Sequence, residues 1–297
     1  MVDAVQPGPG PLPARLLLAT DLSARCDRAL DRAAQLAVQW KAELVALHVL
    51  DPAASPEQTL AWIGGTNHAA LLQAAAQQLS RDLGQVKVPV ALRVGASNDV
   101  AATVEETAAR DDAGLVVTAV SQGGALRQFL LGSTVERLAR SLPQPLLVVR
   151  KRPHGPYQRV LVASDFSQPS RQALRVAAQL FPAHELIVYH ARMKTLAGLV
   201  DAAPTEGGDT QAGQDECAAF LAASALPGDG KVRCVIEDGA VEVALAQYVR
   251  RHDIDLVVMG SRGRSGVMSL LLGSTASRLL EWLPCDTLLV REPRGTA

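Results

Sequence analysis

Two stretches of the chain decide its fold: residues 132–150, which read GSTVERLARSLPQPLLVVR, and residues 273–291, which read GSTASRLLEWLPCDTLLVR. They align without a gap, and ten of their 19 positions are identical. A second pair lies earlier in each half, where RLLLATDLS from Arg15 resembles RVLVASDFS from Arg159. The first pair is offset by 141 residues and the second by 144. The sequence therefore predicts a duplication of one structural unit.

Length and repeat positions together divide the chain into segments. Its 297 residues are about twice a typical domain of roughly 150. We expect a flexible leader in residues 1–14, which are rich in proline and do not form the pattern of a secretory signal. The first domain is then predicted at 15–150, a linker with two prolines at 151–157, and the second domain at 158–297.

Composition excludes several classes of protein. The 30 acidic and 29 basic residues nearly cancel, whereas nucleic-acid-binding proteins usually carry a basic excess. No apolar run approaches the ~18 residues of a membrane span, so we expect neither nucleic acid nor a membrane as partner. The four cysteines have no CxxC spacing and are predicted to be reduced thiols of a cytoplasmic protein.

Apolar runs alternate with helical patterns in each half. The runs are short, rich in Val, Leu and Ile, and lack polar alternation, as expected for strands covered on both faces. In the second half, helices are predicted at 167–180 and 241–252, and strands at 159–163, 185–190, 231–236, 255–259 and 287–290. In the first half, strands are predicted at 15–20, 43–50, 86–94, 115–119 and 146–149. The predicted fold is α/β, with two doubly wound, five-stranded, parallel-sheet domains in tandem, whose ligands would bind beyond the carboxyl ends of the strands.

The loop after the fourth strand of the second half has the features of an anion site. Gly260, Gly263 and Gly266 fall within seven residues, directly after an apolar run that ends at Met259. Glycines there let the backbone turn tightly and present bare N–H groups to an anion. The same pattern also fits a purely structural glycine-rich turn.

The helix after this loop opens with Gly273-Ser274-Thr275, where unpaired N–H groups and the helix dipole favour a phosphate. Ser274 either caps this helix or donates its hydroxyl to a phosphate oxygen. Arg262 and Arg264 add positive charge within reach of a polyphosphate. The sequence therefore favours a phosphate-bearing ligand in the second half.

The spacing Gly260-x2-Gly263-x9-Gly273-Ser274 is similar to the ATP-binding signature of the universal stress protein family. The resemblance extends to the Asp-x-Ser that begins at Asp165 and to the final strand, and it covers both halves. It implies a Rossmann-like fold of the adenine nucleotide alpha hydrolase type. It also implies bound ATP, with ADP or AMP and a need for Mg²⁺ left open.

The resemblance further assigns roles to individual residues. It implies that Asp165 lies beside the adenine, and that Ala191 takes the place where the family usually has a valine against the base. It implies that the glycines and Ser274 hold the ribose and phosphates. The predicted nucleotide site comprises Ala163, Ser164, Asp165, Ala191, Met259, Gly260, Arg262, Gly263, Arg264, Gly273, Ser274 and Thr275.

The first half departs from this pattern. Counting back 141 residues, Ala119 and Gln122 replace the first two glycines of the signature. Ser133-x-x-Glu136 has capping-box spacing, which puts a carboxylate at the third helical position, where the second half has Ser277. Such a carboxylate opposes an arriving phosphate. We therefore expect the second half to bind nucleotide and the first half to bind it weakly or not at all.

Sequence patterns for catalysis are missing: the chain has no GxxxxGK[ST], HExxH or GxSxG. Asp165 could be a general base or metal ligand, but a hydrogen-bonding role at the strand end is favoured. His48 and His190 occupy matching places at the end of the second strand of each half, and a shared structural role, such as a hydrogen bond at the strand end, is favoured over catalysis. We expect a nucleotide-binding stress or signalling module with little or no catalysis. The alternatives are a scaffold that binds no nucleotide and a slow nucleotide phosphohydrolase.

The final strands of the two halves, 146–149 and 288–290, are apolar. Unpaired sheet edges need covering, and family resemblance implies that such strands pair in an internal pseudo-dimer. A further homodimer and an unidentified protein partner stay open. The polar, glycine-rich segment 201–214 is expected to be a mobile loop near the second site.

Overall fold

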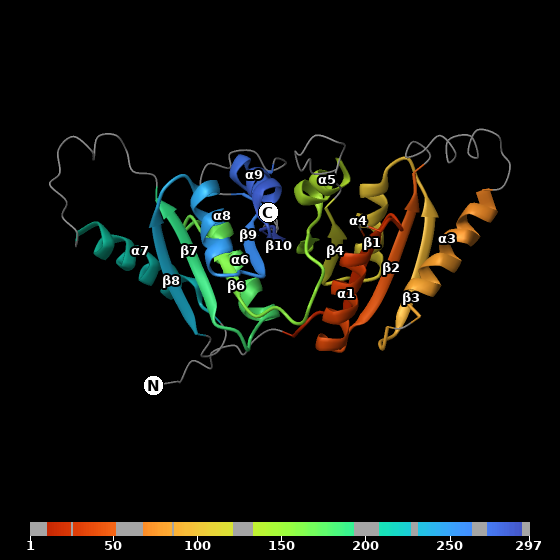
Figure 1. Ribbon diagram of the computed structural model, residues 1–297, viewed down its shortest axis with the longest axis horizontal. Coiled ribbons are helices and arrows are strands. Elements are labelled where there is room, and N and C mark those ends of the chain that lie inside the picture. Colours follow the sequence, from red (N-terminus) through yellow and green to blue (C-terminus); the bar gives the residue numbers. More distant parts are fainter. Residues whose placement is uncertain are drawn as a thin grey trace, which may run out of the picture. The chain divides into compact units, whose positions relative to one another are not determined.

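The computed structural model describes residues 11–24, 26–51, 68–84, 86–120, 133–192, 208–226, 231–262 and 272–292. The chain divides into two compact units, Pro13–Pro156 and the part from Tyr157 onwards, and residues 11 and 12 group with the second. Within each unit, helices connect successive strands of a parallel sheet (Figure 1). The predicted fold class, with two like α/β domains in tandem, is therefore confirmed.

The first unit follows the predicted alternation of strands and helices. Its elements are β1 (Arg15–Thr20), α1 (Asp27–Trp40), β2 (Glu43–Leu50), α3 (His68–Asp82), β3 (Val90–Ala96), α4 (Val100–Arg110), β4 (Leu115–Ala119), α5 (Ser133–Ser141) and β5 (Leu146–Val149). The strand order is β3-β2-β1-β4-β5, and all four neighbouring pairs are parallel. The order reverses at β1, as in a doubly wound sheet.

The second unit repeats this plan. Its elements are β6 (Val160–Ala163), α6 (Gln168–Leu180), β7 (Leu186–Arg192), α7 (Gly208–Ser224), β8 (Val232–Asp238), α8 (Val241–Arg251), β9 (Leu256–Gly260), α9 (Ser274–Trp282) and β10 (Asp286–Val290). The strand order is β10-β9-β6-β7-β8, again with parallel neighbours. Here β6 is the strand at which the order reverses.

Central strands are buried on both faces in each unit. Leu16, Leu17 and Leu18 of β1 have no exposed surface, and the same holds for Val160–Val162 of β6. Continuous apolar runs rather than alternating ones are what a parallel sheet with helices on both sides requires. The prediction drawn from these runs is confirmed.

Adjacent residues of β7 show which helices cover which face of the second sheet. The Tyr189 ring packs against Tyr248 of α8, with 4.9 Å between ring centroids. The next residue, His190, points to the opposite face and stacks on Phe166, which in turn contacts Phe220 of α7. Side chains alternate across a strand, so α7 and α8 cover opposite faces.

Two predicted boundaries were wrong. The strand expected at 86–94 is β3, which begins at Val90, because Pro89 has no N–H to donate and supplies only its carbonyl, which accepts from Leu44. The segment 201–214, expected to be a loop, includes the first residues of α7, which begins at Gly208. Residues 201–207 lie outside the described part of the chain.

The expectation of four reduced thiols was also wrong. Cys217 of α7 and Cys234 of β8 form a disulfide, with 6.6 Å between their Cα atoms. Cys26 and Cys285 are free and buried. Burial raises the pKa of the Cys26 thiol to about 11, so this group stays protonated and unreactive at neutral pH.

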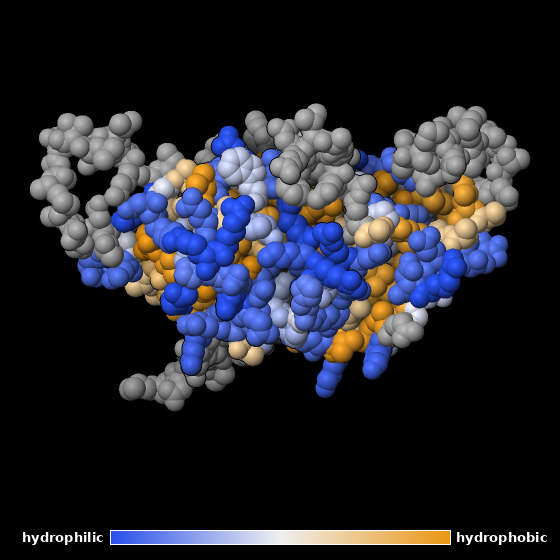
Figure 2. Space-filling view, in the orientation of Figure 1, coloured by the Kyte–Doolittle hydropathy of each residue, from blue (hydrophilic) through white to orange (hydrophobic). Residues whose placement is uncertain are grey.

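Hydrophilic residues cover much of the face seen in Figure 2. The large apolar side chains that are exposed among the described residues are scattered: Leu12, Val38, Val243 and Trp282. Isolated apolar residues of this kind are normal on a protein surface. Among the helices that the structure describes, none is long and apolar enough to cross a membrane.

Candidate functional site

A pocket of about 270 Å³ opens in the second unit where β6, β7 and β9 end and α9 begins. It lies beside β6, where the strand order reverses. Open α/β sheets bind their ligands at this position, because the loops there diverge to opposite faces. The fold therefore places a cavity where the sequence predicted one.

The pocket brings together most of the residues predicted to bind nucleotide. Those that line it are Ala163, Ser164, Asp165, Ala191, Met259, Gly260, Arg262, Gly273, Ser274 and Thr275. The two remaining predicted residues, Gly263 and Arg264, lie outside the described residues. Seven further residues that sequence reasoning missed also line the pocket: Ser170, Tyr189, His190, Val241, Leu245, Ala276 and Leu279.

The turn after β6 is held by side-chain hydrogen bonds. The Asp165 carboxylate accepts bonds from the Ser167 N–H at 3.1 Å and from the Ser170 hydroxyl at 2.8 Å. Ser167 caps α6 by accepting from the Ser170 N–H at 3.4 Å. Between them, Phe166 adopts a left-handed backbone with φ of 61°. Asp165 is thus a hydrogen-bonding group at the strand end, the role favoured from the sequence.

The first unit builds the same turn. Leu22 has φ of 60°, and the Ser23 N–H donates to Asp21 at 2.9 Å. Left-handed backbone is uncommon for residues with a branched side chain, so its recurrence shows that the turn belongs to the fold. The turn alone therefore does not distinguish a domain that binds a ligand from one that does not.

Two histidines stabilise these turns from the neighbouring strand. His48 Nδ1 lies 2.9 Å from the Thr20 carbonyl oxygen, and His190 Nδ1 lies 2.7 Å from the Ser164 carbonyl oxygen. Each histidine therefore makes a hydrogen bond at the end of its strand, and the predicted structural role is confirmed. Burial lowers the pKa of His48, which keeps the imidazole neutral at physiological pH.

The start of α9 presents backbone N–H groups to the pocket. Gly273 is the N-cap, with φ of −60° and ψ of 143°, and it makes no side-chain capping bond. Ser274 is therefore the first helical residue and not the cap, which leaves its hydroxyl for the other predicted role. In α9, which is described throughout, the first turn also has no acidic residue. These N–H groups and the helix dipole favour an anion.

Gly260 is required by a close approach of two backbones. A Cβ atom at this position would lie 3.0 Å from the Arg262 carbonyl oxygen and 3.1 Å from the Cβ of Pro169. Pro169 stands in the first turn of α6, so the end of β9 and the start of α6 almost touch here. A glycine lets the pocket floor close at this point.

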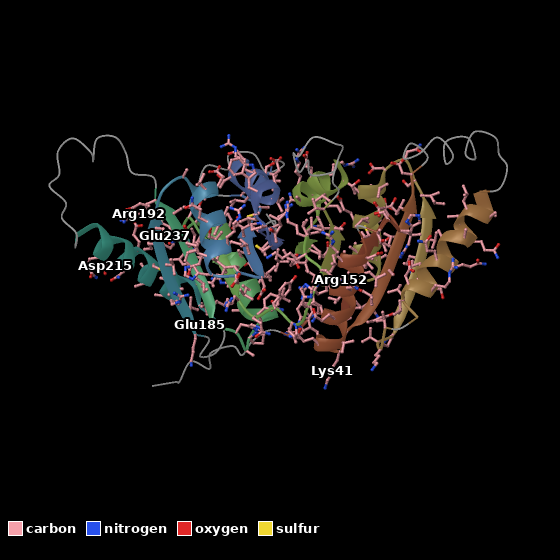
Figure 3. The ribbon with its side chains drawn as sticks, viewed as in Figure 1. Lys41, Arg152, Glu185, Arg192, Asp215 and Glu237 are labelled. Carbon is pink, nitrogen blue, oxygen red and sulfur yellow. A yellow bond between two sulfur atoms is a disulfide. The ribbon has the colours of Figure 1, made fainter. Side chains whose placement is uncertain are left out.

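A polar cluster supports the pocket wall from behind. The Tyr189 hydroxyl donates to Glu237 at 3.0 Å, and Arg251 donates to both oxygens of the same carboxylate at 2.9 and 3.0 Å. Burial, followed by the Glu237 carboxylate, raises the pKa of Tyr189. Figure 3 labels Glu237 and, near it, Arg192, which is not part of this cluster: Arg192 lies on the other face of the sheet and forms an ion pair with Asp238 at 3.2 Å. The cluster fixes Tyr189 as a hydrogen-bond donor in the wall.

The first unit differs where the phosphate features would be. Ala119 ends β4 at the position of Gly260 and is buried. The capping-box prediction for Glu136 was wrong in detail: α5 begins at Ser133, and the Glu136 carboxylate accepts from Arg140 at 3.2 Å, one turn further along the helix. Glu136 nonetheless lies in the first turn of α5. Gln122 and the rest of this loop lie outside the described residues.

The described residues offer no metal centre of the usual kind: within them, no three His, Cys, Asp or Glu side chains cluster. The described pocket lining combines apolar side chains, hydroxyls, backbone N–H groups, the Asp165 carboxylate, the His190 imidazole and one arginine.

Comparison with known proteins gives consistent results for both units. Residues 14–150 and 156–291 each match the model of the Universal stress protein family. A universal stress protein of Mycolicibacterium smegmatis is 28% identical over 301 residues, which cover 93% of this chain and 96% of the relative. One from Thermus aquaticus is 31% identical over 137 residues, which cover 46% of this chain and 99% of the relative.

Solved structures agree in fold along most of the chain. A universal stress protein from Archaeoglobus fulgidus is 21% identical with a TM-score of 0.63, covering 93% of this chain and 98% of that one. A Pseudomonas aeruginosa protein described as functionally unknown is 19% identical with a TM-score of 0.67, covering 94% and 92%. The tandem arrangement is therefore shared with other proteins.

Proposed function

The chain belongs to the universal stress protein family, as a tandem member, and from this premise we propose that its second domain binds an adenine nucleotide, ATP in the first place. The observation that carries the proposal is the pocket beside β6, which gathers ten of the residues predicted for this role. Its volume of about 270 Å³ is just below the range of roughly 300–1,000 Å³ of small-molecule sites. That size suits an adenosine, with the phosphates at the mouth.

The phosphate end of the ligand would lie at the start of α9. Gly273 leaves the first-turn N–H groups without a side-chain cap, and Ser274 and Thr275 add hydroxyls at the pocket lining. Of the described lining residues, Arg262 is the permanent cation. Backbone N–H groups, hydroxyls and a guanidinium together are the donors that a polyphosphate accepts from.

The base end would lie between the ends of β6 and β7. Ala163 and Ala191 give apolar surface there, and Met259 of β9 adds to it from the other side of β6. Val241 and Leu245 of α8 extend this surface. Flat apolar walls with a few polar groups suit a purine. Asp165 stands at this end with its carboxylate already oriented by Ser167 and Ser170, which supports a role in positioning the base.

We propose little or no turnover of the nucleotide. The acid–base candidates in the pocket are committed to structure: Asp165 accepts from two serine groups, and His190 bonds the Ser164 carbonyl through Nδ1. Efficient phosphoryl transfer needs charge placed at the transferring group and a positioned nucleophile. A binding module whose occupancy signals to other proteins fits this arrangement better than a phosphohydrolase.

The first domain is proposed to act as a scaffold. Ala119 adds a Cβ where the second domain has Gly260, and Glu136 puts a negative charge into the first turn of α5. Two like domains in one chain fit an internal pseudo-dimer, in which one half binds and the other supports it. A cytoplasmic location, a further homodimer and a protein partner belong to the same proposal.

Arg262→Gln tests the phosphate end of the site. We expect the variant to lose about tenfold in ATP affinity, because one charge-assisted contact is removed, while adenosine affinity stays unchanged. Isothermal titration calorimetry with both ligands measures the difference.

The matched control is Arg278→Gln. Arg278 lies on α9 but pairs with Glu242 at 3.3 Å, outside the pocket lining, so its removal should leave both affinities unchanged. Equal losses of ATP and adenosine affinity in Arg262→Gln would contradict the placement of the phosphates.

A further inference from the structure

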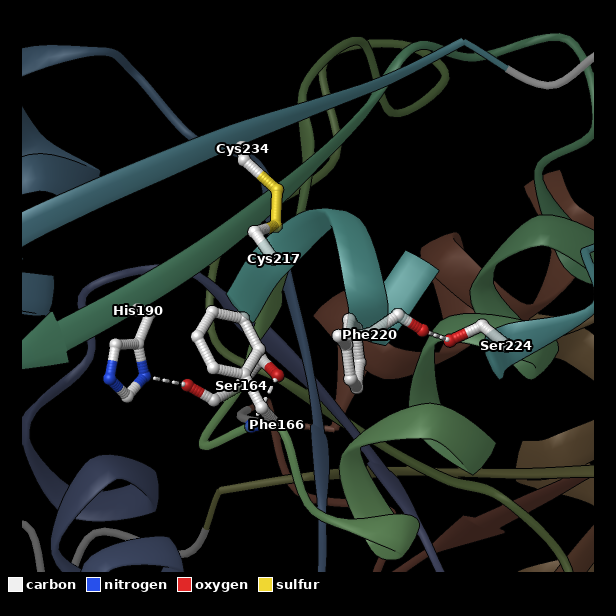
Figure 4. Close-up of a disulfide and its surroundings, with 7 residues drawn as sticks. All are labelled: Ser164, Phe166, His190, Cys217, Phe220, Ser224 and Cys234. Carbon is white, nitrogen blue, oxygen red and sulfur yellow. Dashed lines mark hydrogen bonds between the residues drawn. A yellow bond between two sulfur atoms is a disulfide. The ribbon is translucent and has the colours of Figure 1, made fainter. Parts of the chain in front are cut away.

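The disulfide of the second domain fastens α7 to the edge of the sheet. Cys217 lies on α7 and Cys234 on β8, the outermost strand of its five. Figure 4 shows the bond above a row of aromatic rings that leads from α7 to His190. The neighbourhood of the pocket is therefore joined to a group that can be oxidised or reduced.

Apart from this bond, α7 has few attachments to the sheet. Its buried face, as far as its side chains are described, consists of Gly213, Cys217, Phe220 and Ser224. Phe220 is the large apolar side chain among these four. A Cβ on Gly213 would lie 2.9 Å from the Ile236 side chain, so glycine serves close approach and adds no apolar side chain. Little hydrophobic burial holds the helix once the disulfide is removed.

Phe220 connects α7 to the pocket wall. Its ring centroid lies 5.3 Å from that of Phe166, and Phe166 stacks on His190 at 4.5 Å. His190 lines the pocket and bonds the Ser164 carbonyl at 2.7 Å. Phe166 is also the left-handed residue of the turn that orients Asp165. A shift of Phe220 would therefore displace both His190, which lines the pocket, and the turn that orients Asp165.

The two sulfur atoms differ in exposure. Cys217 is 1% exposed, whereas Cys234 is half-buried on the edge strand. An attacking thiolate needs access to one sulfur along the direction of the S–S bond. Cys234 is the more exposed of the two residues and therefore the expected point of attack.

We propose that Cys217–Cys234 is a reversible redox site that controls the wall of the nucleotide pocket. A dithiol reductant attacks Cys234 as its thiolate, forms a mixed disulfide there, and releases Cys217 as a thiolate that takes up a proton. The second thiol of the reductant then displaces Cys234, so that two electrons and two protons reach the protein and the reductant becomes a disulfide. Reduction releases α7 from β8 and leaves it held to α6, where Arg175 donates to the Ser224 carbonyl at 2.7 Å. Phe220 then packs less firmly against Phe166.

The consequence for the ligand rests on the proposed function. If ATP occupies the pocket, the oxidised protein should bind it at least about fivefold more tightly than the reduced protein, the lower end of usual coupling between sites. The consequence for α7 does not depend on ATP. Amide exchange in residues 211–224 should become faster on reduction, because the helix opens locally more often.

The experiment compares the full-length protein after oxidation and after treatment with dithiothreitol. Hydrogen exchange of α7 and calorimetric ATP affinity are measured on both forms. Cys26→Ala, in the other domain, keeps the disulfide and should respond as the wild type does. The double variant C217S/C234S should match the reduced form in both measurements. Dithiothreitol should change neither its α7 exchange nor its ATP affinity.

Each outcome decides a separate point. Equal exchange of α7 in the two forms overturns the redox site. Redox-dependent exchange with equal ATP affinities overturns the coupling to the pocket. Redox-dependent exchange in a protein that binds no ATP in either form supports the redox site and contradicts the proposed function.

Brief treatment of the oxidised wild type with reduced glutathione tests which sulfur is attacked. After alkylation of the released thiol, glutathione should be found mainly on Cys234 and the alkyl group on Cys217, because Cys234 is the more exposed residue. Mass spectrometry locates both groups. Glutathione found mainly on Cys217 would overturn the assignment of Cys234 as the point of attack.

Discussion

Gly260→Val is expected to lower the free energy of unfolding of the second domain by about 3 kcal/mol, at the upper end of the usual cost of overpacking. The added Cβ would meet the Arg262 carbonyl oxygen at 3.0 Å and Pro169 at 3.1 Å. The first neighbour is a backbone oxygen and the second a carbon of a proline ring, so neither can rotate away as the end of a long side chain could. Differential scanning calorimetry measures the loss as a lower melting temperature of one transition.

The matched control is Gly95→Val on β3. Gly95 is also a strand glycine, but a Cβ there meets nothing within 4 Å, so its substitution should change stability by less than about 0.5 kcal/mol. Equal effects of the two variants would contradict the argument that β9 and α6 need a glycine where they meet.

Gly273→Glu is expected to reduce ATP affinity about hundredfold, which corresponds to ~2.7 kcal/mol. The new carboxylate would stand at the N-cap of α9, where it competes for the N–H groups and repels the phosphates. The fold should tolerate the change, because an anion at a helix N-terminus is favourable and the glycine has φ of −60°. Calorimetric titration measures the affinity, and circular dichroism checks the fold.

Gly132→Glu is the corresponding change in the first domain, at the position that the repeat aligns with Gly273. It should leave ATP affinity unchanged, because the first domain is not proposed to hold the ligand. If Gly132→Glu weakens binding as much as Gly273→Glu does, the asymmetry between the domains is wrong.

Much of the fold follows from the sequence because the strands are buried. A strand covered on both faces has to be apolar throughout, as Leu16–Leu18 and Val160–Val162 are. Such runs stand out between amphipathic helices, and the repeat places each of them twice. The turns after β1 and β6 were predictable from the repeat, because Asp21 and Asp165 play the same role in the two halves.

What the sequence did not give depends on contacts between distant elements. The disulfide joins residues 17 apart on a helix and a strand, and cysteine spacing alone carries no sign of their meeting. Gly213 makes α7 look like a loop in composition, yet it serves to bring that helix close to Ile236. The start of β3 was readable from Pro89, which sits one residue before the strand.

The residues of the candidate site also fall into two groups, those that the sequence predicts and those that it does not. Its predicted residues follow strand ends or open a helix, positions that a doubly wound fold brings together by its topology. The missed residues reach the pocket through packing instead. Val241 and Leu245 are one turn apart on α8, and Tyr189 is placed by Glu237 on the next strand. Apolar helix residues of this kind look the same in sequence whether they line a cavity or fill a core.

We propose that the chain has one nucleotide site that binds ATP, in its second domain. Calorimetric titration of the full-length wild type and of Gly273→Glu measures the number of ATP molecules bound per chain. We expect one ATP per chain in the wild type and none at the same ligand concentration in the variant. Two equivalent sites per chain, or one site that survives Gly273→Glu, would contradict it.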